Sequence, residues 1–172
     1  RIRDIIMKRF NEMLVKRVLF IAIFVSLGGY SLSELRAQST VYIFMRSLGN
    51  FHSNIKLNGE KTFSLQGNLK KAVPVNNGKF LSVYSAVKKK FVLKNEGKYH
   101  FQYVGQFVNV NNGKTIDYTA EIQINATEGS THYYELVPKG IYDIQFKELK
   151  EKDGLKLLKK DKYQMLTDYI EE

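Results

Sequence analysis

The chain has 172 residues, no cysteine and a formal net charge of +10 at pH 7. The absence of cysteine excludes disulfide bonds, a thiol nucleophile and the lipid-bearing cysteine of a bacterial lipoprotein. Residues 1–37 hold seven Lys/Arg and three Asp/Glu, a charge of +4, and the remaining chain holds 20 and 14, a charge of +6. This modest surplus predicts a weak attraction to acidic surfaces such as phospholipid or anionic polysaccharide.

The first segment, residues 1–37, has the pattern of an upstream extension followed by a secretory signal peptide. Lys16 and Arg17 precede an apolar run from Val18 to Leu27. A cationic start, a short apolar core and a small residue before the cut are the three parts of such a signal. Ala37 supplies the small residue, so we predict cleavage between Ala37 and Gln38, and either Met7 or Met13 as the true start.

An uncleaved membrane anchor is the alternative interpretation of this segment. A spanning helix needs about 20 mostly apolar residues. The clean apolar run is shorter, and Gly28, Gly29 and Ser31 interrupt its end. The cleaved signal is therefore favoured. It predicts an exported protein, in the periplasm, at the outer membrane surface or outside the cell, for which nucleic acid is not an expected partner.

Residues 38–152 alternate apolar and polar side chains, the period of a half-buried strand. The inward sets are Tyr99, Phe101 and Tyr103; Tyr118, Ala120, Ile122 and Ile124; and Tyr142, Ile144 and Phe146. The segment Val41–Met45 is instead apolar on both faces, which predicts a central strand covered on two sides.

Turn signals separate these runs. Asn58-Gly59, Asn77-Gly78 and Asn112-Gly113 favour tight hairpins, because asparagine and glycine tolerate positive φ. Pro74 and Pro138 are expected at strand ends. The segment is therefore predicted to be a mainly β domain, an antiparallel β-sandwich that is Ig-like or barrel-like.

The last segment, residues 153–172, changes to helical spacing. Leu155, Leu158, Met165 or Leu166, and Tyr169 recur on one stripe. Asp153 is a suitable N-cap. We predict one amphipathic C-terminal helix, broken near Asp161, that packs on the sandwich.

Four segments carry a resemblance to a known family. They are Val41–Arg46, Ile55–Glu60, Glu121–Tyr134, and Phe146–Leu149 with Gly154–Lys160. These segments resemble a family of small exported bacterial β-domains of unknown function, many of which are lipoproteins. This chain lacks their lipid-bearing cysteine, and residues 70–110 match only loosely. The resemblance implies a sandwich-like domain in the cell envelope and implies no activity.

Histidines and carboxylates are the first candidates for chemistry. His100 and His132 would form a metal or acid–base pair only if their strands were neighbours, and His52 is far from both in sequence. A zinc site needs three or four ligands, so solvent-facing histidines are favoured. Asp117 and Glu121 could belong to a hydrolase pair, although a solvent-facing role is simpler. We assign no catalytic, cofactor or metal residues.

Aromatic and basic residues are the candidates for binding. Tyr133 and Tyr134 must point to opposite faces of a strand, so one of them leaves the core, as does Tyr84 or Phe80. We expect the outward ring to be covered by the C-terminal helix or a loop. The run Lys88-Lys89-Lys90, with Lys94 and Lys98 nearby, could contact anionic lipid or polysaccharide. A solvated hairpin edge is the favoured interpretation of that run.

The sequence thus predicts a non-catalytic exported protein of the cell envelope, a binding or scaffolding module without a cofactor. Its expected partner is an envelope protein or a polysaccharide. A carbohydrate- or surface-binding module is the alternative, and a hydrolase comes last.

Overall fold

A computed structural model describes residues 38–46, 51–74, 78, 80–108, 114–140 and 143–171. The predicted upstream extension and signal peptide, residues 1–37, lie outside the described residues. So do Asn77, Tyr142 and the turn Asn112-Gly113. No helix within the described residues is long and apolar enough to cross a membrane.

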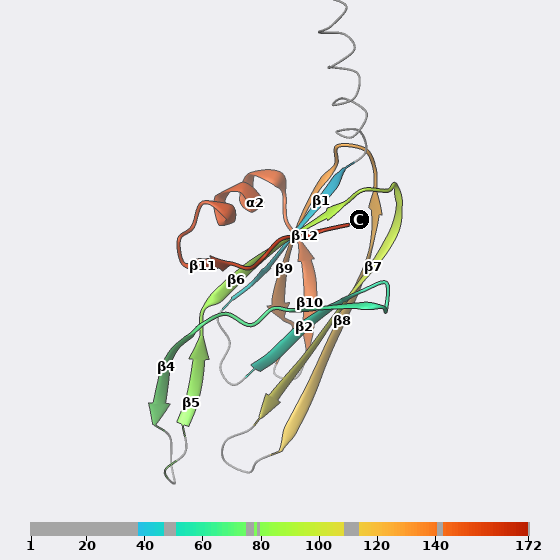
Figure 1. The fold of residues 1–172 in the computed structure, drawn as a ribbon. Helices are drawn as coiled ribbons and strands as arrows, with labels where there is room; N and C mark the ends of the chain where they lie inside the picture. Colours follow the sequence, from blue (N-terminus) through green and yellow to red (C-terminus); the bar gives the residue numbers. More distant parts are fainter. Residues whose placement is uncertain are drawn as a thin grey trace, which may run out of the picture. The chain divides into compact units, whose positions relative to one another are not determined.

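Two large sheets and one separate strand pair make up the described fold (Figure 1). The first sheet has the order β10 (Ile144–Glu148), β9 (Thr131–Pro138), β1 (Ser39–Met45), β6 (Ala86–Leu93) and β11 (Tyr163–Met165), and β12 (Tyr169–Ile170) also pairs with β6. The second sheet has the order β3 (Lys61–Ser64), β2 (Phe51–Leu57), β7 (Gly97–Val108) and β8 (Thr115–Ala126). The separate pair, which we call the arm, consists of β4 (Leu69–Pro74) and β5 (Phe80–Tyr84).

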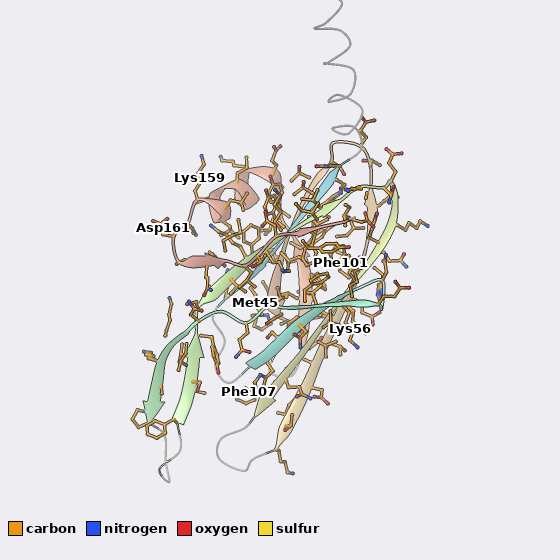
Figure 2. The ribbon with its side chains drawn as sticks, in the orientation of Figure 1. Met45, Lys56, Phe101, Phe107, Lys159 and Asp161 are labelled. Carbon is orange, nitrogen blue, oxygen red and sulfur yellow. The ribbon has the colours of Figure 1, made fainter. Side chains whose placement is uncertain are left out.

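The hydrophobic core lies between the two large sheets, which confirms the predicted β-sandwich. The ring of Phe91 on β6 meets the ring of Phe101 on β7 edge-on, with centroids 5.2 Å apart. Phe63 on β3 meets Phe91 in the same way at 5.3 Å. Figure 2 shows Phe101 and Met45 directed into this interior. The aromatic residues of the alternating strands therefore join the two layers.

Strand β1 is central in the first sheet and covered on both faces, as its sequence predicts. Val41, Ile43 and Met45 enter the core between the sheets. Tyr42 and Phe44 belong to a second apolar cluster on the opposite face. The strand is antiparallel to β6 but parallel to β9, and β11 and β12 are parallel to β6. The first sheet is therefore mixed, whereas the prediction was of antiparallel sheets.

The alternation predicted for the second sheet is confirmed. Tyr99, Phe101 and Tyr103 on β7 are buried, and β7 pairs antiparallel with β8 along its whole length. The turn between β2 and β3 has positive φ at both Asn58 (51°) and Gly59 (74°), as a tight hairpin turn requires. Pro74 and Pro138 are the last residues of β4 and β9.

The predicted helix over residues 153–172 is wrong in extent. Helix α2 runs from Glu151 to Leu158, with Lys150 at its N-cap position in place of Asp153. The chain then turns at Asp161, on the outside of the fold in Figure 2, and continues as the two short strands β11 and β12. Backbone hydrogen bonds to β6 replace helical ones: Leu166 N donates to Lys88 O at 2.9 Å, an ordinary length for such a bond. An unpaired strand edge therefore overrides the helical spacing of the sequence.

Helix α2 packs on the first sheet through its glycine. A Cβ atom at Gly154 would lie 2.3 Å from the ring of Tyr133, so only glycine allows this close approach. Leu157 and Leu158 pack in the same cluster, whereas Leu155, expected on the buried stripe, is 41% exposed. The helix thus covers the face of the first sheet that points away from the sandwich core.

Candidate functional site

The three histidines do not come together. His100 lies on β7, where its Nε2 is 3.3 Å from Glu121 Oε2 on β8. His132 lies on β9 of the other sheet, with its Nε2 3.1 Å from the hydroxyl of Ser130. His52 is exposed on β2. The strands of His100 and His132, β7 and β9, belong to different sheets and are not neighbours as a metal or acid–base pair would require. No cluster of three metal-binding side chains occurs among the described residues.

The register places each candidate carboxylate, Asp117 and Glu121, opposite a glutamine of β7 and not opposite another acid, and the two are too far apart to pair with each other. Asp117 and Glu121 are four residues apart on β8, a separation of about 13 Å on an extended strand. Glycosidase pairs are about 5–9.5 Å apart. Each carboxylate accepts a hydrogen bond from a glutamine of β7, Gln106 to Asp117 at 2.9 Å and Gln102 to Glu121 at 2.7 Å. They form part of a polar outer face.

The lysine run is not at a hairpin edge, contrary to the favoured interpretation of the sequence. It lies on β6, inside the first sheet, and contacts the last residue of α2 and the segment that follows the helix. Lys88 Nζ donates to Leu158 O and Lys89 Nζ to Thr167 O, both at 2.6 Å. Lys90 Nζ lies 3.7 Å from Asp168. The sequence did not show this role, because it depends on residues 70 or more positions away.

Lys89 is the most unusual of the three, since its side chain is only 6% exposed. It follows the inward alternation of β6 between Val87 and Phe91. Its ammonium lies over the rings of Phe63 and Phe91, 5.3 and 5.6 Å from their centroids. Burial lowers the pKa of Lys89, and the charge of Asp168 opposes that effect. The ring contacts and the Thr167 carbonyl offset part of the cost of burying the charge.

A second buried charge lies on the opposite side of the first sheet. Glu135 on β9 is 5% exposed and accepts a hydrogen bond from Arg46 Nε at 2.8 Å. The hydroxyl of Tyr163 on β11 is 3.4 Å from the same oxygen. The hydrogen bond and charge of Glu135 raise the pKa of Arg46. These contacts connect β1, β9 and β11, so Glu135 has a structural role.

Both adjacent tyrosines of β9 are buried. Tyr134 enters the core between the sheets. Tyr133 points to the opposite face, where it stacks on Tyr42 with centroids 5.4 Å apart and lies against Gly154 of α2. The expectation that the C-terminal helix covers the outward ring is therefore confirmed, and this pair does not form an exposed sugar-binding face.

Two of the five large apolar side chains that are exposed among the described residues lie on the arm, at its opposite ends. Leu69 on β4 is 57% exposed and Phe80 on β5 is 58% exposed. The register pairs Leu69 with Tyr84 and Pro74 with Phe80, which places Leu69 and Phe80 on one face of the two-stranded sheet. Figure 1 shows the arm standing away from the two large sheets, with β5 continuing the line of β6. A two-stranded ribbon has too little core to bury such side chains by itself.

The base of the arm is held to the sandwich. Ser85 N donates to Asn68 O at 2.8 Å, and Asn68 N donates to the side-chain oxygen of Gln164 at 2.8 Å. A Cβ atom at Gly67 would lie 2.6 Å from the Ser85 carbonyl, so the chain passes close to β6 there. The arm is therefore an anchored projection. Among the predicted residues, Phe80 is the aromatic that the structure leaves exposed.

No family model, no curated protein and no solved structure matches the chain.

Proposed function

We propose that the chain is a non-catalytic, exported binding or scaffolding module of the bacterial cell envelope that holds a protein partner through the arm. The observation that carries this proposal is the exposure of Leu69 and Phe80 on one projecting ribbon. Large apolar side chains exposed along one face of a projecting element are available to a partner. The charged and polar candidates elsewhere, Lys89, Glu135 and Glu121, are engaged in contacts within the fold.

Export is tested by expressing the full chain and sequencing the N-terminus of the protein recovered from each cell fraction. The signal pattern around Lys16 and Arg17 predicts that the mature protein begins at Gln38 and leaves the cytoplasm. Recovery of the protein from the cytosol with residues 1–37 intact would contradict the proposal. Recovery from the membrane with the leader retained would favour the anchor.

The role of the arm is tested by photo-crosslinking in intact cells. A photoreactive residue in place of Phe80 is expected to give a discrete crosslinked product, because this side chain is 58% exposed on the arm. The matched control carries the same residue in place of Thr119, which is exposed on the outer face of β8. Equal labelling at both positions, or none at Phe80, argues against the arm as the docking element.

A carbohydrate-binding module is the second candidate, because an exposed aromatic ring such as Phe80 can stack on a sugar. Retention of the protein on immobilised envelope polysaccharide, lost in Phe80→Ala, would favour this second function over a protein partner.

A further inference from the structure

We propose that the partner docks as an extended acidic peptide segment that adds a strand to the outer edge of β4. This inference rests on the proposed role of the arm and names the chemistry of its partner.

The outer edge of β4 is open to strand addition. Within the described residues, β4 pairs with β5 alone, and five of its six residues are exposed. Strand β5 is less open, since four of its five residues are half-buried. An edge strand presents a row of unpaired N–H and C=O groups, and an extended peptide can satisfy them. The exposed Leu69 lies at the start of this edge and offers an apolar contact to the added strand.

The charge of this region selects an acidic segment. Lys70 and Lys71 are adjacent and exposed on β4 itself. Residues 69–84, the span of the arm, contain three lysines and no aspartate or glutamate. Opposite charges on neighbouring strands stabilise pairing and like charges oppose it. An acidic strand beside β4 would therefore gain both backbone hydrogen bonds and charge pairs.

The same residues argue against a second copy of this chain on the edge. Two arms paired through β4 would bring their lysines together. Lysine on an edge strand is one of the means by which natural sheets avoid pairing with copies of themselves, whereas it favours an acidic strand.

A lipid surface fits the arm less well than a peptide does. Lysines and exposed apolar side chains would suit an anionic membrane, but unpaired backbone groups are not tolerated in hydrocarbon. A peptide strand satisfies those groups and a lipid does not. The backbone edge of β4 therefore distinguishes between these two classes of partner.

The test uses the full chain and a synthetic peptide with alternating glutamate and valine, about eight residues long, the length of an ordinary strand. We expect saturable binding in fluorescence anisotropy that weakens as salt is added, because the charge pairs are exposed. Two control peptides are a lysine–valine version and a glutamate–valine version with alternate backbone nitrogens methylated. Both should fail to bind, the first through charge repulsion and the second through loss of hydrogen-bond donors.

A matched pair of variants locates the binding edge. Lys70→Glu with Lys71→Glu should weaken binding about tenfold or more, as the loss of two exposed charge pairs implies. Lys98→Glu with Lys147→Glu makes the same change in net charge at exposed positions outside the arm and should bind as the wild type does. Circular dichroism of both variants checks that each remains folded.

Three results would overturn the inference: no binding of the acidic peptide, equal loss in the two double variants, or equal binding of the methylated peptide. Two further results would overturn it. One is concentration-dependent dimerisation that the Lys70→Glu, Lys71→Glu variant loses. The other is binding of the protein to phosphatidylglycerol vesicles but not to the peptide. If the acidic peptide does not bind but crosslinking at Phe80 persists, the arm still docks a partner. Only the inference that this partner is an acidic strand is then wrong.

Discussion

Replacing Phe91 by alanine is expected to lower the free energy of unfolding by about 3–5 kcal/mol, the usual cost of removing a buried phenyl ring. Phe91 is fully buried and joins the two sheets through edge-on contacts with Phe63 and Phe101. Its ring also lies beneath the ammonium of Lys89. The variant therefore loses packing in the core and one of the contacts that offset the burial of that charge.

Urea denaturation followed by circular dichroism measures this effect as a lower transition midpoint with an unchanged slope. The matched control is Phe80→Ala on the arm, whose ring is 58% exposed. It removes the same atoms from a surface position, so its cost should stay within about 0.5–1 kcal/mol. Equal destabilisation by the two substitutions would mean that the sheets are not joined through Phe91.

Raising the pH above 10 is expected to destabilise the fold through its buried tyrosines. Burial raises the pKa of five of them above the ordinary value of 10.0, namely Tyr99, Tyr103, Tyr133, Tyr134 and Tyr163. An unfolded tyrosine loses its proton near pH 10, whereas these folded ones hold it to higher pH. The unfolded state therefore binds fewer protons in this window, and the free energy of unfolding falls as pH rises.

Tyr99 gives the most specific form of this prediction, because burial and the Glu171 carboxylate raise its pKa to about 12. Its hydroxyl donates to Glu171 Oε2 at 2.7 Å. The contribution present below pH 10 and lost by pH 12 is about 1–2 kcal/mol after allowance for solvent screening.

Chemical denaturation across this pH range, combined with the absorbance of tyrosinate, measures the effect. Tyr99→Phe should flatten the decline between pH 10 and 12. Glu171→Gln should lower the pKa of Tyr99, since it removes the negative charge beside the phenol. A pH dependence identical in the wild type and both variants would show that Tyr99 ionises as freely in the folded protein as in the unfolded one.

The sandwich could be predicted from sequence because its strands carry their own signals. Tyr99, Phe101 and Tyr103 alternate with polar residues. The face of the sheet to which each side chain points therefore follows from the geometry of a single strand. The apolar run Val41–Met45 indicated a strand covered on both faces, and β1 is one. Local information was enough for these elements.

The C-terminal segment could not be predicted in the same way. Its leucines and tyrosine fit a helical stripe, yet residues 163–165 and 169–170 pair with β6. This pairing depends on the edge of β6, which is formed by residues more than 70 positions earlier. The spacing of apolar residues within the segment carries no information about that edge. The buried position of Lys89 follows from the same distant contact, with Thr167. The alternation of β6 did place Lys89 on the inward face, and that was the available signal.

The candidate site lies between these two cases. The sequence indicated that Tyr84 or Phe80 would leave the core, and Phe80 does so. It did not show that β4 and β5 form a ribbon of their own, because each contains enough apolar residues for a covered strand. Within the described residues β4 pairs with β5 alone, a tertiary property that the composition of neither strand reports.

The late position of β11 and β12 in the chain has a consequence for biosynthesis. Every other strand of the sandwich is made before them, but Lys89 acquires its carbonyl partner only when Thr167 has emerged from the ribosome. Until then the nascent domain has an open flank and a cationic group facing its apolar interior. Completion of the first sheet therefore waits until residues 163–170 have been synthesised, after every other strand of the fold.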